Sequence, residues 1–121
     1  MKNENVIRDK SFTFSVRVLK LYQFLRKKKV DLGLCPQLLD SGTSIGANVE
    51  EAIGGSSRKD FINKLQIAYK EARETQYWLR LLEAGKLIDK KLADSFINDC
   101  TELIRILTSI LNSSKASSSN Y

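Results

Sequence analysis

The chain has 121 residues, 42% of them hydrophobic and 28% charged, which is typical of one soluble globular domain. It contains one proline and six glycines, too few for a β-sandwich with many turns. The absence of histidine removes the commonest general base and the usual partner of a Ser or Cys nucleophile, so an enzyme is not expected. The net charge is +6, and eight basic residues against one acidic residue lie between Arg8 and Lys29, which indicates either a polyanionic partner or a solvated helix face.

Residues 9–29 are expected to form the first helix. A strand over TFSVRVLKL is the alternative, but the helical spacing persists longer. One apolar stripe follows the spacing i, i+4, i+7, i+11 through Phe14, Val18, Leu21 and Leu25. A second stripe, on nearly the opposite side, contains Phe12, Val16 and Leu19. Because a small bundle needs to bury only one of these faces, we expect the second to pack on another subunit.

A loop over residues 30–34 around Gly33 is expected to lead into a second helix at 36–53. Pro36 suits the first helical position, where a missing N–H costs nothing, and Gly54 and Gly55 end the helix. The apolar face of this helix contains Leu38, Ile45, Val49 and Ala52.

Residues 41–51 read SGTSIGANVEE, a composition that favours loops, yet the flanking pattern places them inside the second helix. Small residues let this helix approach its neighbours, with the alanine-rich middle of the third helix as a natural partner. A side chain at Gly42 or Gly46 is expected to clash. Buried polar groups need partners, so we expect a structural polar network across the second and third helices that contains Ser44, Asn48, Glu51 and Glu74.

Other chemistry at this stretch is less well supported. SGTSIG lacks the GK[ST] ending and the preceding strand of a Walker loop. Glu51 and Glu74 could suit a metal, but the di-iron pattern needs E-x-x-H motifs, so no metal or other cofactor is expected. The cysteines, Cys35 and Cys100, form no CxxC pair and are expected to be free buried thiols in a reducing cytosol.

Two further helices are expected, at 58–84 and 90–113, with Ser57 and Asp89 as their caps. The first has a seam of alternating four- and three-residue spacing through Phe61, Leu65, Ala68, Ala72, Thr75, Leu79 and Leu82. The second repeats this spacing through Phe96, Cys100, Leu103, Leu107 and Ile110. Residues 114–121 are polar and expected to be disordered. Four helices with short connections predict a single all-α domain, an antiparallel up-down-up-down four-helix bundle.

Four segments of the chain are distinctive: SIGANVEEA, SRKDF, QIAYKEARETQYWL and LLEAG. They resemble a bacterial four-helix-bundle family whose founding members are encoded by intervening sequences within large-subunit ribosomal RNA genes. Members are often called, misleadingly, small-subunit ribosomal proteins, and the accessory variability determinants of diversity-generating retroelements are similar to them. The resemblance covers about residues 10–111, with Ala68 and Glu74 at matching helix-three positions. Ala52 departs from it, because many members have glycine there. The most specific part, S-I-x-x-N-V-x-E, is here Ser44, Ile45, Asn48, Val49 and Glu51.

The resemblance implies a ring-shaped homopentamer without known enzymatic activity. It also implies a possible role in binding nucleic acid and a reverse transcriptase, which the retroelement relatives bind through basic surfaces. We therefore expect an oligomeric bundle that binds RNA or DNA phosphates with little sequence preference, through Arg17, Lys20, Arg26, Lys27, Lys28 and Lys29. The alternative is a scaffold whose basic face docks an acidic protein. With no signal peptide or membrane span recognised, a cytoplasmic location is expected.

Overall fold

A computed structural model of the chain contains four helices: α1 (Lys2–Lys27), α2 (Leu34–Ile53), α3 (Arg58–Ala84) and α4 (Lys90–Ser119). The structure describes residues 2–29 and 33–119, and these include no strand. Most of the expected first loop, residues 30–32, and the last two residues of the expected tail, 120–121, lie outside the described residues. The all-α four-helix fold predicted from the sequence is confirmed.

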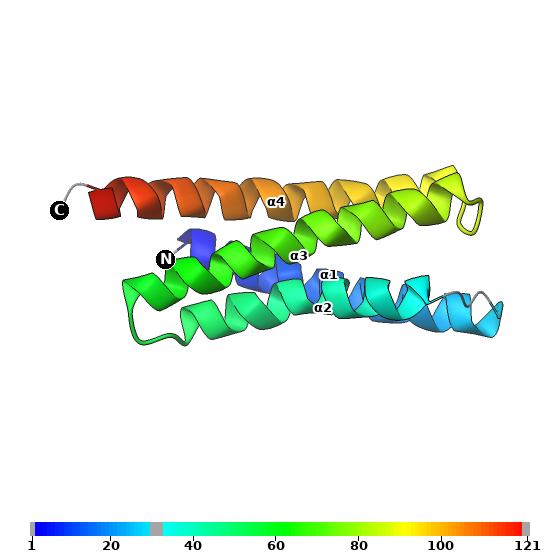
Figure 1. The fold of residues 1–121 in the computed structure, drawn as a ribbon, viewed down its shortest axis with the longest axis horizontal. Helices are drawn as coiled ribbons and strands as arrows, with labels where there is room; N and C mark the ends of the chain where they lie inside the picture. Colours follow the sequence, from blue (N-terminus) through cyan, green and yellow to red (C-terminus); the bar gives the residue numbers. More distant parts are fainter. Residues whose placement is uncertain (1, 30–32, 120–121) are drawn as a thin grey trace.

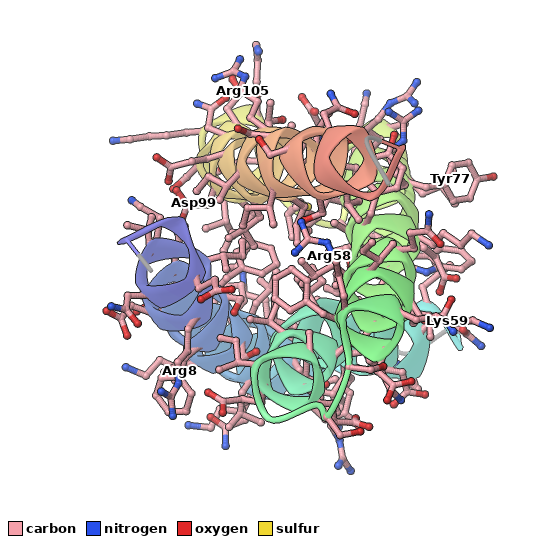
Figure 2. The ribbon with its side chains drawn as sticks, turned by 90° about the vertical axis from the view of Figure 1, so that its left-hand side faces the viewer. Arg8, Arg58, Lys59, Tyr77, Asp99 and Arg105 are labelled. Carbon is pink, nitrogen blue, oxygen red and sulfur yellow. The ribbon has the colours of Figure 1, made fainter. Side chains whose placement is uncertain are left out.

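The helices lie at the four corners of a bundle in which each packs against two neighbours and α1 lies diagonally opposite α3 (Figures 1 and 2). Neighbouring helices run in opposite directions (Figure 1). Along α1, for example, Lys10 pairs with Glu102 of α4, while Arg17, further along, pairs with the earlier residue Asp99. The carboxyl end of α1 therefore lies at the same end of the bundle as the α3–α4 turn (Figure 1).

The core contains the apolar stripes that the sequence pattern predicts. On α1 these are Phe14, Val18, Leu21 and Leu25, all buried, and the Phe14 ring meets Phe96 of α4 edge to face at 6.2 Å between centroids. Each buried leucine- or phenylalanine-sized side chain contributes about 1.5–3 kcal/mol to folding.

The described part of the chain contains no helix that is both long and apolar enough to cross a membrane.

Several helix ends differ from the sequence prediction. Helix α1 begins at Lys2 rather than near residue 9, because its buried stripe continues back through Ser11 to Ile7. The polar Ser11 interrupts the apolar pattern in the sequence, although its side chain is buried. Helix α4 continues to Ser119, which contradicts the disorder expected from residue 114 onward. There, Ser114 keeps the spacing of the stripe and is buried.

The predicted caps are confirmed. The Ser57 hydroxyl accepts a hydrogen bond from the backbone N–H of Asp60 at 3.1 Å, and one Asp89 carboxylate oxygen accepts from the N–H of Leu92 at 2.7 Å. Gly54 ends α2 as expected. The helix begins at Leu34, two residues before Pro36, and the proline is accommodated because the first four N–H groups of a helix have no partner within it.

The segment SGTSIGANVEE lies inside α2, and its glycines allow α2 to approach α1. A Cβ atom on Gly42 would lie 2.8 Å from both methyl carbons of Val18, and one on Gly46 would lie 3.2 Å from the backbone oxygen of Ser11. The expected clash is thus supported, but the glycines face α1 and not the alanine-rich middle of α3. Ser41 is the small residue of α2 that meets α3 in a polar contact, where its hydroxyl accepts from Thr75 at 2.9 Å.

The Gly42 contact leads to a stability prediction. Substitution Gly42→Ala should lower the free energy of unfolding by about 1–3 kcal/mol, because Val18 is fully buried and its β-branched side chain has one favoured rotamer in a helix. The gain in helix propensity of up to about 1 kcal/mol is too small to offset this clash. Urea denaturation followed by circular dichroism measures the difference.

The matched control is Gly54→Ala. Gly54 has φ −81°, and an added Cβ would have its nearest neighbour at an ordinary 3.5 Å. This control should unfold within about 0.5 kcal/mol of the wild type. A Gly42→Ala variant as stable as the wild type would show that α1 and α2 separate there without cost.

Candidate nucleic-acid interface

The basic residues from Arg8 to Lys29, which lie on α1 and on the turn after it, divide into two groups. The earlier ones are engaged with neighbouring helices: Arg8 pairs with Glu50 of α2 at 2.7 Å, and Lys10 pairs with Glu102 of α4 at 3.1 Å. Those further along are exposed and form no ion pair with another described residue: Lys20, Arg26, Lys27, Lys28 and Lys29. The excess positive charge of the first helix is therefore available mainly near its carboxyl end.

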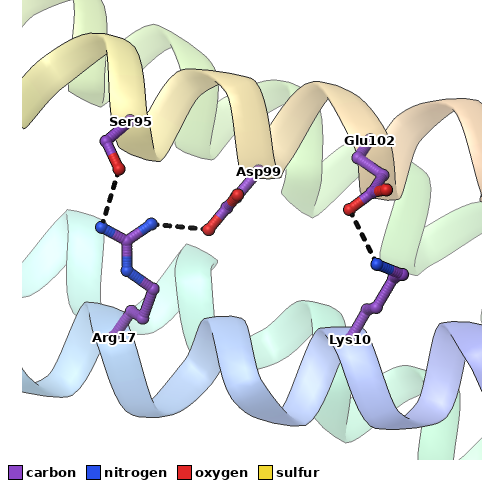
Figure 3. Close-up of polar contacts among 5 residues, drawn as sticks. All are labelled: Lys10, Arg17, Ser95, Asp99 and Glu102. Carbon is purple, nitrogen blue, oxygen red and sulfur yellow. Dashed lines mark hydrogen bonds and ion pairs between the residues drawn. The ribbon is translucent and has the colours of Figure 1, made fainter.

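Arg17, which the sequence analysis expects to bind phosphate, belongs to the engaged group. Its guanidinium donates to the Asp99 carboxylate at 2.5 Å and to the Ser95 hydroxyl at 3.0 Å (Figure 3). The same group lies 4.0 Å from the centre of the Phe96 ring. A guanidinium held by a carboxylate, a hydroxyl and a ring would have to give up these contacts to bind a phosphate. Arg17 therefore joins α1 to α4.

Two cations of the exposed group, Arg26 and Lys28, rest on aromatic rings of α1. The Arg26 guanidinium lies 5.7 Å from the centre of the Tyr22 ring, and the Lys28 ammonium lies 4.6 Å from that of Phe24. Both distances suit cation–π attraction, which holds the stem of each side chain against the helix and leaves the donors exposed to solvent. The charges are thus presented on a defined surface.

The α3–α4 turn adds cations to this end of the bundle. Lys86 of the turn and Lys90, the first residue of α4, line a surface pocket together with Lys28, the residue after α1. Lys90 also pairs with Asp94 at 2.8 Å, and the hydrogen bond and charge of that carboxylate raise the pKa of Lys90. Hereafter the term basic end refers to Arg26, Lys27, Lys28, Lys29, Lys86 and Lys90.

The lysines of the turn were missed in the sequence analysis. They lie about sixty residues after the basic run, and no local motif connects the two segments. The predicted antiparallel topology contains the signal that would have identified them. In that topology the end of the first helix lies beside the connection between the third and fourth helices.

The second apolar stripe of α1 lies on its solvent-facing side. Phe12 is 67% exposed, Val16 36% and Leu19 45%. None of the four helices fully covers these side chains, and the expected contact with a second subunit stays a prediction. Large exposed apolar side chains in a row are typical of a surface that binds a partner.

The four residues of the expected polar network do not join α2 to α3 in the core. The Ser44 hydroxyl donates to the Asp40 backbone oxygen, and the Asn48 amide donates to that of Ser44, both within α2. Glu51 does reach α3, but through an exposed ion pair with Lys64 at 3.0 Å. Glu74 accepts from the Trp78 indole one turn along α3. Serine and asparagine bond readily to the carbonyl four residues earlier, so they need no partner on another helix.

Three carboxylates, Asp40 of α2 and Glu71 and Glu74 of α3, lie near one another at the α2–α3 seam. Burial, with the nearby carboxylates of Glu74 and Asp40, raises the pKa of Glu71. No group of three or more candidate metal ligands occurs in the part of the chain that the structure describes.

Both cysteines are buried thiols outside any disulfide, as predicted. Burial, followed by the charge of Asp99, raises the pKa of Cys100 to about 12, and its thiol donates to the backbone oxygen of Ala72 at 3.2 Å. A thiol with this pKa is almost entirely protonated at neutral pH and is a poor nucleophile. Cys100 is therefore a packing residue of the α3–α4 contact.

Comparisons with known proteins agree with this architecture. Residues 3–109 match the family described as 23S rRNA-intervening sequence protein. A crystal structure from Bacteroides thetaiotaomicron VPI-5482, described as a protein with unknown function from the S23 ribosomal protein family, is 48% identical with a TM-score of 0.89. The match covers 91% of this chain and 98% of that one. No curated protein matches the sequence.

The contacts of Arg17 lead to a prediction about stability. Substitution Arg17→Ala should lower the free energy of unfolding by about 1 kcal/mol at low salt, because it removes a half-exposed ion pair and a cation–π contact between α1 and α4. The difference should shrink at high salt, which screens the ion pair. Denaturation at both salt concentrations measures it. Lys20→Ala is the control, and equal stability of the two variants at low salt would contradict the role assigned to Arg17.

Proposed function

The chain belongs to the family of 23S rRNA-intervening sequence proteins, and from this membership together with the charge of α1 we propose that it is a non-enzymatic, oligomeric bundle that binds nucleic acid. The basic end and Lys20 supply the contacts. They bind phosphates, so affinity depends little on base sequence.

The observation that carries the proposal is the division of charges on α1. Arg8, Lys10 and Arg17 are neutralised by carboxylates of neighbouring helices, whereas Lys20 and Arg26–Lys29 have no such partner among the described residues. Cations near a helix carboxyl end are stabilised by the helix dipole, by about 0.3–1 kcal/mol each. This effect accounts for some of the run but not for Lys20, two turns earlier, nor for Lys86 on the turn after α3. A polyanion accounts for all of them.

Assembly forms the second part of the proposal. The exposed stripe of Phe12, Val16 and Leu19 suits the packing of α1 against another copy of the chain. The family resemblance favours five subunits. Each subunit added to such an assembly brings one more basic end, so weak phosphate contacts are multiplied by effective concentration.

Salt dependence tests the binding. Binding to duplex RNA or DNA should weaken steeply as salt rises, because each phosphate that is bound releases a counterion. Replacing Lys27, Lys28 and Lys29 by glutamine should reduce the slope of log K against log salt by about 0.9 for each duplex phosphate that the variant no longer binds. The fold should remain, since these side chains are exposed. Fluorescence anisotropy over a salt series gives the slope.

The control variant removes the same charge elsewhere, with glutamine at three exposed cations of α3: Lys59, Lys70 and Arg73. If the control changed the slope by the same amount, binding would depend on net charge alone and not on the basic end. If the wild type binds neither RNA nor DNA at low salt, the proposal fails. A scaffold that docks an acidic protein on the basic end then takes its place.

Assembly is tested with Val16→Glu combined with Leu19→Glu. The charged pair should dissociate the oligomer without unfolding the bundle, because both side chains are solvent-exposed within one subunit. Light scattering measures the mass, and circular dichroism measures the helix content. Ile67→Glu, at a residue of α3 that is 41% exposed, is the control and should leave the mass unchanged. A wild-type monomer at micromolar concentration would refute the proposed assembly.

A further inference from the structure

A row of α1 residues at seven-residue spacing faces α4 and the turn before it. Lys10 and Arg17 occupy the first two positions of this row and pair with Glu102 and Asp99 (Figure 3). Phe24 occupies the third position. Because α1 and α4 run in opposite directions, the row reaches the beginning of α4 at this point. An aromatic ring thus stands where the two preceding positions hold cations.

Phe24 lines a surface pocket of about 500 Å³ at this end of the bundle. Its apolar lining also includes Leu87, Ile88 and Leu92. Phe24 remains 42% exposed. The pocket therefore offers an aromatic ring and aliphatic side chains to a ligand, a combination typical of a binding site.

Three of the side chains that line the pocket are lysines, Lys28, Lys86 and Lys90, and two are acidic, Glu83 and Asp89. Lys90 is paired with Asp94 at 2.8 Å, so Lys28 and Lys86 are the lining cations without a carboxylate partner among the described residues. One oxygen of Asp89 is occupied as the cap of α4, where it accepts from the N–H of Leu92. Arg26 and Lys27 line a separate surface pocket of α1. The pocket, with Phe24 and three aliphatic side chains in a lining that is otherwise charged, matches a ligand that has a flat uncharged ring beside negative groups.

We propose that this pocket takes an unpaired nucleobase of single-stranded RNA, stacked on Phe24 in place of the Lys28 ammonium that lies 4.6 Å from the ring centre, while Lys28 and Lys86 hold the flanking phosphates. This inference rests on the proposed function and names the class of nucleic acid. A base inside a duplex has both faces covered by its neighbours, so it cannot stack on Phe24. RNA displays unpaired bases in its loops and ends, and aromatic side chains are their common stacking partners.

The test compares a mixed-sequence single-stranded RNA that cannot pair internally with an RNA duplex of the same length, at one salt concentration. Phe24→Leu keeps an apolar side chain but removes the ring. It should weaken single-strand binding by about tenfold, as expected when one base can no longer stack on an aromatic ring, and duplex binding by less than about twofold. Phe24→Tyr keeps the ring and should bind the single strand like the wild type, which separates stacking from any effect on folding.

Tyr77→Leu is the matched control, because Tyr77 is an exposed aromatic residue of α3 outside this pocket and should leave both affinities unchanged. If Phe24→Leu weakened single-strand and duplex binding equally, the stacking assignment would be overturned. It would also be overturned if the wild type bound nucleic acid and Phe24→Leu bound both RNAs as tightly as the wild type. Tighter binding of single-stranded DNA than of RNA would overturn the assignment to RNA. Absence of wild-type binding to either RNA would instead refute the proposed function itself.

Discussion

The rotation of α1 about its own axis is set by its close approach to α2. Gly42 and Gly46 leave no room for a side chain between the two helices, so Val18, Ser11 and Ser15 lie directly against the α2 backbone. A shift of α1 by one residue would turn its surface by about 100° and replace these small contacts with larger or charged side chains. The position of every other α1 residue follows from this contact.

Three faces of α1 result, each with its own chemistry. The core face buries Phe14, and the face toward α4 presents Lys10 and Arg17 to carboxylates. The outward face exposes the stripe of Phe12, Val16 and Leu19. Of the four seams in the bundle, that between α1 and α4 has the sparsest backbone contact, and ion pairs cross it. Half-exposed ion pairs add little stability, so they are better regarded as setting the register between two helices that share little apolar surface.

The sequence was sufficient for features with a helical period or a local cause. Burial of Phe14 and Leu21, the cap at Ser57 and the helical state of residues 41–51 all follow from spacing or from bonds within four residues. The role of Arg17 was not predictable in this way, because it depends on which α4 carboxylate lies across the seam, and periodicity within one helix carries no information about register between helices. Lys86 was missed for the same reason. The expected network around Asn48 failed differently, because a local bond to Ser44 satisfied the amide first.

Proposed assembly and proposed binding are linked through charge. The exposed stripe and the basic end lie on the same helix, so subunits that pack through α1 in a ring, all pointing the same way, would bring their basic ends to one side of the assembly. Like charges gathered there repel one another, and the repulsion opposes assembly most strongly at low salt. A polyanion bound across several subunits would remove that repulsion. Coupling between two binding equilibria is reciprocal. Bound nucleic acid would then raise the affinity between subunits by the same factor by which assembly raises the affinity for nucleic acid.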